Sequence, residues 1–253
     1  MKTKAALPFQ VAFSFLVACI SFLATPAPAS AQSAPAGGSR EILSVSWQPG
    51  YCAARPKSRG CTDFSPASSA AKQFSLHSRF QTWSSYCGID AGLKQRARKG
   101  KWTDLPEVTL ASGTRERLLT AMPAARLGFD RQQWLRSGSC VAASAEVYYS
   151  RSLDLLDQLN ASPIPSLLKQ KAGGIVTLTE VRAAFDTAFD TAFGPGAGER
   201  VRLSCRKAGD QTFVIGLTIG LVRGEGKLPA LISGASPRKS RCTEGFMAAA
   251  GAG

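Results

Sequence analysis

Alternation of apolar and polar residues marks the first predicted strand, at residues 41–48 (EILSVSWQ). A period of two places alternate side chains on the two faces of a sheet. Residues 201–205 and 212–222 are more continuously apolar, which is typical of buried strands in a central sheet. Residues 73–76 add a short strand with His77 at its end, and residues 53–72 are expected to form a loop.

Helices are predicted for residues 112–122, 130–137 and 146–159, and the last is amphipathic and expected to cover the core. Residues 177–180 (TLTE) form a capping box that begins another helix. On its core-facing side, aromatic residues recur four apart: Phe185, Phe189 and Phe193. The stretch 194–198 (GPGAG) ends that helix and lacks the strand-then-helix context of a nucleotide-binding loop.

The N-terminus has the pattern of a secretory signal peptide at residues 1–31. Two lysines precede an apolar run at residues 11–24, and Ala-Ser-Ala at 29–31 predicts cleavage before Gln32. The run is short for a membrane span, so none is expected. A lipoprotein box ending at Cys19 is the competing interpretation, but the apolar stretch continues past that cysteine. Residues 32–40 (QSAPAGGSR) are expected to be a disordered linker.

Export permits disulfides, and six cysteines follow the leader: Cys52, Cys61, Cys87, Cys140, Cys205 and Cys242. Six cysteines allow about 15 pairings. A metal site is the weaker interpretation, because no C-x-x-C occurs and His77 is the only histidine of the chain. We therefore expect neither a metal nor another cofactor.

The chain is strongly basic, with 31 Lys and Arg against 17 Asp and Glu, a formal net charge of +14. Such a charge favours polyanionic partners, namely RNA, DNA, anionic lipid or acidic polysaccharide, although it also serves solubility alone. The densest basic run comprises Lys94, Arg96, Arg98, Lys99 and Lys101. It predicts either direct contact with RNA or a solvated helix face, and Trp102 beside it is expected to pack.

Candidate chemistry lies in two stretches, residues 74–87 (FSLHSRFQTWSSYC) and 129–140 (FDRQQWLRSGSC). In the second, helical spacing places Gln132 with Arg136, and Gln133 with Ser137, on one broad face. A third motif, residues 46–52 (SWQPGYC), follows the first strand.

Together these motifs resemble the T2 family of secreted acid ribonucleases, over about residues 43–205. That family has F-T-x-H-G-L-W-P and H-E-W-x-K-H-G-T-C, and its bacterial members open with S-W-x-P-x-[FY]-C. The resemblance implies an α+β fold with a central antiparallel sheet flanked by helices. It also implies the disulfides Cys87–Cys140 and Cys205–Cys242, which leaves Cys52 and Cys61 for a short loop.

Members of this family cleave single-stranded RNA through its own 2′-hydroxyl and form a 2′,3′-cyclic phosphate without a metal. One histidine is the general base, another is the general acid, and neighbouring groups hold the phosphate. The resemblance places His77 at the general-acid position and Ser137 at the position of the general base. It assigns phosphate binding to Gln132, Gln133 and Arg136.

The sequence departs from the family where catalysis depends on it. Gln132, Gln133 and Ser137 stand where the family has His, Glu and His, and a serine hydroxyl cannot accept a proton at useful pH. Loss of a general base costs about 10²–10⁴-fold in rate. Residues 78–80 (SRF) also replace Gly-Leu-Trp. Ser137 is not a hydrolase nucleophile either, because G-x-S-x-G and a second histidine are missing.

We therefore predict one ribonuclease T2-like domain at residues 41–245 and a flexible tail at 246–253. The expected protein is a periplasmic or secreted monomer that binds single-stranded RNA or another polyanion, with cleavage weak or lost. One alternative is an active endoribonuclease with His77 as general acid. The other is an envelope module that binds proteins on the same scaffold.

Overall fold

The computed structural model describes residues 41–58, 60–61, 64–190 and 196–251. The predicted leader at 1–31 with Cys19, the linker at 32–40 and Phe193 lie outside the described residues.

A mixed sheet organises the described part of the chain, in the order β2-β1-β5-β6-β3, with β4 paired to the other side of β5. Its strands are β1 (Glu41–Ser46), β2 (Ser75–Gln81), β3 (Ile175–Thr177), β4 (Val201–Ala208), β5 (Gln211–Leu221) and β6 (Glu244–Phe246). All neighbouring strands run antiparallel except β5 and β6, which pair in parallel at Phe213 and Phe246.

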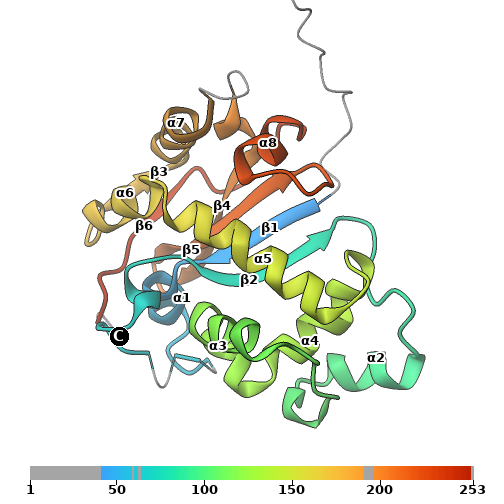
Figure 1. Ribbon diagram of the computed structural model, residues 1–253. Coiled ribbons are helices and arrows are strands. Elements are labelled where there is room, and N and C mark those ends of the chain that lie inside the picture. Colours follow the sequence, from blue (N-terminus) through green and yellow to red (C-terminus); the bar gives the residue numbers. More distant parts are fainter. Residues whose placement is uncertain (1–40, 59, 62–63, 191–195, 252–253) are drawn as a thin grey trace, which may run out of the picture. The chain divides into compact units, whose positions relative to one another are not determined.

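Helices flank this sheet (Figure 1). They are α1 (Gln48–Ala54), α2 (Ala91–Arg98), α3 (Ser112–Ala121), α4 (Phe129–Arg136), α5 (Ala145–Asn160), α6 (Ile164–Gln170), α7 (Leu178–Phe189) and α8 (Leu228–Ser233). Short 3₁₀ turns are η1 (Ser69–Ala71), η2 (Trp102–Asp104), η3 (Pro123–Leu127), η4 (Gly138–Cys140) and η6 (Ala197–Arg200). The longest helix, α5, crosses β5, β1 and β2 on one face (Figure 1).

The main core lies between α5 and the sheet. Leu43 and Val45 of β1 and Leu217 of β5 meet Tyr148 and Leu156 of α5, and all five are buried. A second, smaller core joins α2 to α4 through Tyr86, Ala97, Leu105 and Leu135. The second core therefore fixes the basic helix beside the helix that carries the candidate site.

The predicted fold class is confirmed: the chain has an α+β fold with a central sheet flanked by helices. The three predicted disulfides, Cys52–Cys61, Cys87–Cys140 and Cys205–Cys242, are all present. The three predicted helices correspond to α3, α4 and α5, and the capping box at Thr177 and Glu180 begins α7. Within α7, Phe185 and Phe189 are buried in the core, as expected.

Several predicted boundaries were wrong. The first strand ends at Ser46, and Gln48–Ala54 forms α1 in place of a strand end and loop. Pro49 suits the first helical turn, where its missing N–H is not needed. His77 lies inside β2 and not at a strand end.

The boundary of the C-terminal tail also needs correction. The tail was expected to begin at residue 246, but Phe246 is the last residue of β6. Met247 and Ala248 are buried, and the backbone of Met247 bonds to Gly173 and Gly174. Contacts with residues distant in sequence therefore hold residues 246–248 in place, although the Ala- and Gly-rich composition of this end predicted a flexible tail.

None of the helices formed by the described residues has the length and apolar character needed to cross a membrane.

Candidate functional site

His77 occupies a β-bulge. In the pairing of β1 with β2, Ser44 lies opposite Ser78 and Val45 lies opposite Leu76, so His77 has no partner residue across the ladder. A bulge re-aims a side chain and is common beside functional sites. The imidazole packs against the ring of Phe129, at 5.1 Å between centroids, where α4 begins.

A cavity of about 420 Å³ opens beside His77. Its apolar lining includes Tyr51, Trp102, Met122 and Phe129, and its polar lining includes Gln48, Arg55 and Lys99. The rings of Trp102 and Phe129 lie 5.1 Å apart, and the Arg55 guanidinium lies over the Tyr51 ring at 5.8 Å. Flat rings beside cations can stack on a base and attract its phosphate.

His77 is partly buried, and its environment lowers its pKa from 6.5 to about 4. Burial is the larger cause, and the positive charge of Arg136 is the smaller one. The imidazole is therefore neutral at neutral pH. This runs against the expected role as general acid, because a neutral imidazole accepts a proton and has none to spare for a leaving group.

Three other predicted site residues, Gln132, Gln133 and Ser137, form hydrogen bonds with one another. Nε2 of Gln133 donates a hydrogen bond to Oε1 of Gln132 at 2.9 Å, and the Ser137 hydroxyl donates to Oε1 of Gln133 at 3.5 Å. All three side chains are buried. None of them lines the cavity beside His77. They form a neutral chain inside the protein, where the predicted phosphate contacts of Gln132 and Gln133 are not open to a ligand.

Arg136 differs from its neighbours on α4. Its side chain is exposed, and within the described ranges it has no ion-pair partner. It remains close enough to His77 to influence the imidazole. Among the predicted phosphate-binding residues, Arg136 alone keeps both charge and access.

Contacts from other elements fix the position of α4. The Tyr149 hydroxyl donates to the backbone carbonyl of Asp130, and burial raises the pKa of the Asp130 carboxyl. After the helix, Gly138 leaves space for Trp134: a Cβ there would lie 2.4 Å from the indole. Gly138 therefore allows the chain to turn tightly toward Cys140.

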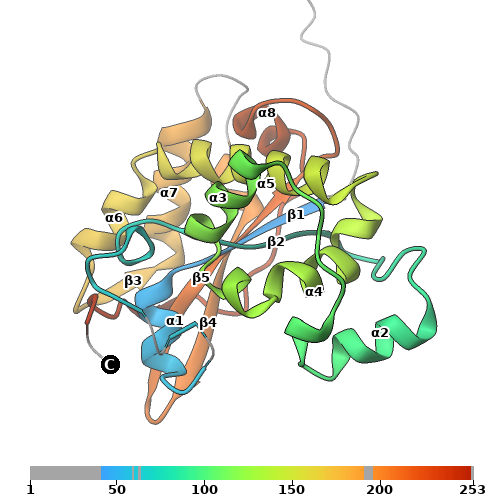
Figure 2. The same ribbon diagram turned by 60° about the horizontal axis from the view of Figure 1, so that its bottom comes forward.

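The basic helix α2 lies beside α4 (Figure 2). Asp90 caps it by accepting from the Leu93 N–H at 2.9 Å. Lys94 and Arg98 each lie 5.6 Å from the centre of the Tyr86 ring. The other three members of the run, Arg96, Lys99 and Lys101, are exposed.

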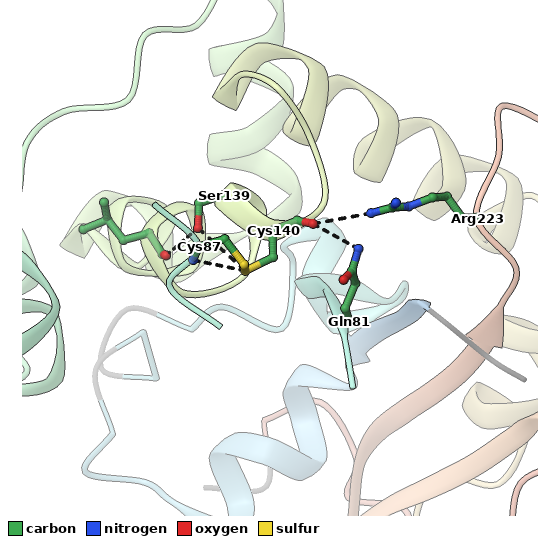
Figure 3. Close-up of a disulfide and its surroundings, with 6 residues drawn as sticks. Gln81, Cys87, Ser139, Cys140 and Arg223 are labelled. Atoms are coloured by element: carbon green, nitrogen blue, oxygen red, sulfur yellow. Dashed lines mark hydrogen bonds between the residues drawn. A yellow bond between two sulfur atoms is a disulfide. The ribbon is translucent and has the colours of Figure 1, made fainter. Parts of the chain in front are cut away.

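Tyr86 joins the basic helix to α4. Its backbone has φ of 58°, a left-handed conformation that is strained for a tyrosine, and its N–H donates to the Arg136 carbonyl at 2.9 Å. The next residue is bonded through the disulfide Cys87–Cys140 (Figure 3). The Cys140 carbonyl in turn accepts from Gln81 at 3.0 Å and Arg223 at 3.5 Å. The end of β2, the start of α2 and the end of α4 are thus held together.

Sequence reasoning missed the cavity. The sequence motif that contains Phe129 indicates no role for its ring, and the pattern around Trp102 predicts packing only. Tyr51 lies in the SWQPGYC motif and Arg55 lies just after it, and that motif indicates the family but no chemistry. Trp83, with 83% of its surface exposed, was also missed. Aromatic residues next to basic ones were the signal that could have drawn attention to this region.

Across the parts of the chain that the structure describes, no three His, Cys, Asp or Glu side chains gather closely enough to hold a metal ion.

Comparisons with known proteins agree with the fold. No protein-family model and no curated protein sequence matches the chain. Among solved structures, the self-incompatibility associated SF11-RNase of Nicotiana alata superposes with a TM-score of 0.53 at 12% identity, over 84% of this chain and 100% of its own. A variant of ribonuclease MC1, a protein of bitter gourd seeds, gives 0.50 at 12% identity, over 82% and 98%. The chain therefore has the fold of T2-type ribonucleases.

Proposed function

We propose that this protein is an exported relative of the bacterial T2 ribonucleases that binds single-stranded RNA and cleaves it weakly or not at all. One observation carries the proposal. An aromatic cavity with cationic lining lies beside His77, while the position of the general base belongs to a buried neutral chain. The three disulfides support export, because such bonds persist in oxidising compartments.

The binding half of the proposal rests on the cavity and its surroundings. Trp102, Phe129 and Tyr51 offer ring faces, and each stacked base contributes about 1–3 kcal/mol in single-strand complexes. Arg55 and Lys99 bring positive charge to the same cavity, and Arg136 lies near His77. A strand with one base in the cavity would have cations within reach of its phosphates.

The catalytic half rests on proton transfer. Cleavage by the 2′-hydroxyl requires one group that removes a proton and another that supplies one. Ser137 cannot act as the base, and its hydroxyl is already bonded to Gln133. His77 is unprotonated above about pH 5 because its pKa is about 4. At neutral pH, Ser137 therefore cannot serve as the general base that the resemblance assigns to it, and His77 has no proton to give as the general acid.

Binding is tested by fluorescence anisotropy with labelled single-stranded RNA at several salt concentrations. The variant Trp102→Ala should weaken binding about 5-fold to 150-fold, the equivalent of about 1–3 kcal/mol for one stacked base. The matched control is Phe213→Ala, which breaks an aromatic pair with Phe246 and does not line the cavity. Equal affinity in both variants, or tight salt-insensitive binding to a protein partner without RNA affinity, would contradict the proposal.

Cleavage is tested with the same RNA and with protein from a host that lacks its own exported ribonuclease. We expect no turnover, or turnover far below that of a ribonuclease with both histidines. Robust cleavage that disappears in His77→Ala would refute the catalytic half.

A second candidate is a slow endoribonuclease in which His77 is the proton acceptor. The lowered pKa favours this role over that of general acid, and the charge of Arg136 could stabilise the phosphate. Its signature is cleavage that rises with pH through about pH 4 and then levels off, since the neutral imidazole is the active form.

A further inference from the structure

Two arginines come together on the edge of the sheet that is remote from His77. Arg202 of β4 lies opposite Thr218 of β5, which lies opposite Ser44 of β1, which lies opposite Ser78 of β2. Three strand-to-strand steps of about 4.8 Å separate Arg202 from Ser78, or about 14 Å. The region around Arg202 is therefore separate from the His77 cavity.

Arg238 belongs to a C-terminal segment that is fastened beside β4. The disulfide Cys205–Cys242 ties the segment to the strand, and the Arg238 N–H donates to the Glu199 carbonyl at 2.8 Å. Arg182 of α7 holds both backbones: it donates to the Val201 carbonyl at 3.4 Å and to the Arg238 carbonyl at 2.7 Å. These contacts fix Arg202 and Arg238 as neighbours.

Among the described residues, no hydrogen bond or ion pair is formed by the side chain of Arg202 or Arg238. In the described part of the chain, the Nε atoms of Arg202 and Arg238 are both buried without a hydrogen bond. Burial and the charge of Arg202 lower the pKa of Arg238. Glu199 is the acidic residue nearest to Arg202 in the sequence, and its Oε2 forms an ion pair with Nη1 of Arg200 at 3.9 Å. Two like charges, partly buried and unpaired, are unfavourable until an anion joins them.

The surrounding surface adds more positive charge. Four further basic residues flank the pair on the same two segments: Arg206, Lys207, Lys239 and Arg241. All four are exposed, and within the described ranges none forms an ion pair. They would draw an anion toward the pair by long-range attraction.

We propose that Arg202 and Arg238 form a second binding site, which takes a phosphate group between their guanidinium forks. A phosphate offers several acceptor oxygens and matches the planar donors of arginine in paired hydrogen bonds. The site goes beyond the proposed RNA cavity and does not depend on it. The phosphate comes either from the free ion or from the backbone of a nucleic acid.

The experiment compares two double variants of the full protein that lose equal charge. Arg202→Gln with Arg238→Gln removes the pair, and Arg206→Gln with Lys239→Gln removes two exposed neighbours. Thermal unfolding is followed with and without inorganic phosphate, against chloride at equal ionic strength. At a phosphate concentration of about 100 times Kd, the wild-type Tm should rise by about 5–10 °C. The first variant should lose this rise and the second should keep it.

A second arm measures anisotropy with labelled single-stranded RNA, and the single variant Arg238→Gln repeats both arms in case the double variant folds poorly. Loss of the phosphate effect alone supports the site with free phosphate as its ligand. Loss of phosphate stabilisation together with RNA affinity supports it with the nucleic acid backbone as the source. Equal phosphate stabilisation in all variants would overturn the proposal. If both double variants lose the effect to the same degree, general charge explains it and the site is refuted.

Discussion

At the scale of the residue, the proton state of His77 decides what the cavity can do. An exposed histidine titrates near the middle of the physiological range, whereas His77 is held neutral by burial and by Arg136. The bulge in β2 creates this environment, because it removes His77 from the ladder and packs it against Phe129. The resemblance assigns His77 the role of proton donor, but its environment suits a proton acceptor.

The titration of His77 can be observed directly, since the chain contains 1 histidine. Proton NMR of tag-free protein should give one imidazole C2–H signal with a midpoint near pH 4 and not near 6.5. Arg136→Gln should raise the midpoint by the smaller part of the difference, because burial is the larger cause. A midpoint close to 6.5 in the wild type would show that the imidazole is more open than its packing indicates.

The same shift predicts how stability depends on pH. The folded-state pKa of about 4 lies below the unfolded value of 6.5, so the unfolded chain binds more protons between these values. The free energy of unfolding should therefore fall as pH drops from 6.5 toward 4, by up to about 3 kcal/mol from this residue. Urea unfolding of the wild type and of His77→Asn at several pH values isolates the contribution of His77 to the free energy of unfolding. The same pH dependence in both proteins would contradict the prediction.

At the scale of the element, α1 shows how a short helix depends on one close contact. Gly50 faces β5, and a Cβ in its place would lie 1.9 Å from the Val214 carbonyl oxygen. Gly50→Ala should therefore lower the free energy of unfolding by about 3 kcal/mol or more, through overpacking. Gly113→Ala is the matched control, because open space surrounds that position in α3. It should be neutral or stabilising by up to about 1 kcal/mol. Similar losses in both would show that helix propensity, and not the contact with β5, governs the effect.

The basic residues of α2 are predicted to contribute to RNA binding through their positive charge alone. Changing Arg96, Lys99 and Lys101 to Gln should flatten the dependence of log affinity for single-stranded RNA on log salt by about 2, since each phosphate contact contributes about 0.7. Lys94 and Arg98 are left intact because they cover Tyr86. The control changes three exposed lysines elsewhere to Gln: Lys72, Lys169 and Lys227. An unchanged slope in the first variant would remove α2 from the interface.

The elements that sequence could predict are those whose pattern is local and long. The amphipathic period of α5, the capping box of α7 and the apolar run of β5 are each contained in their own residues. The bulge at His77 depends on pairing with β1, and α1 depends on contact with β5. Gln132, Gln133 and Ser137 were expected on an open helix face but are buried. Helical spacing predicts which residues share a face, but it does not predict which other elements cover that face.

At the scale of the whole molecule, three disulfides cross-link the described part of the chain. Cys87–Cys140 closes a span of 53 residues and fastens the region of α2 and Tyr86 to the end of α4. Cys52–Cys61 closes only 9 residues, next to α1. Cys205–Cys242 closes 37 and holds Arg238 beside β4. Each covalent link therefore supports a different part of the surface that we assign to binding.

Loop length predicts the order of their contributions to stability. A cross-link removes more entropy from the unfolded chain when it closes a longer loop: about 4 kcal/mol for the span between Cys87 and Cys140, and about 2.5 kcal/mol for that between Cys52 and Cys61. Guanidinium unfolding of the paired Cys→Ala variants measures both losses. The Cys87/Cys140 variant should also lose RNA affinity, because the covalent link between the region of α2 and the end of α4 is then absent. A larger stability loss for the Cys52/Cys61 variant would show that native contacts around Cys52, and not loop entropy, set its contribution. Unchanged RNA affinity in the Cys87/Cys140 variant would show that non-covalent contacts suffice to position α2.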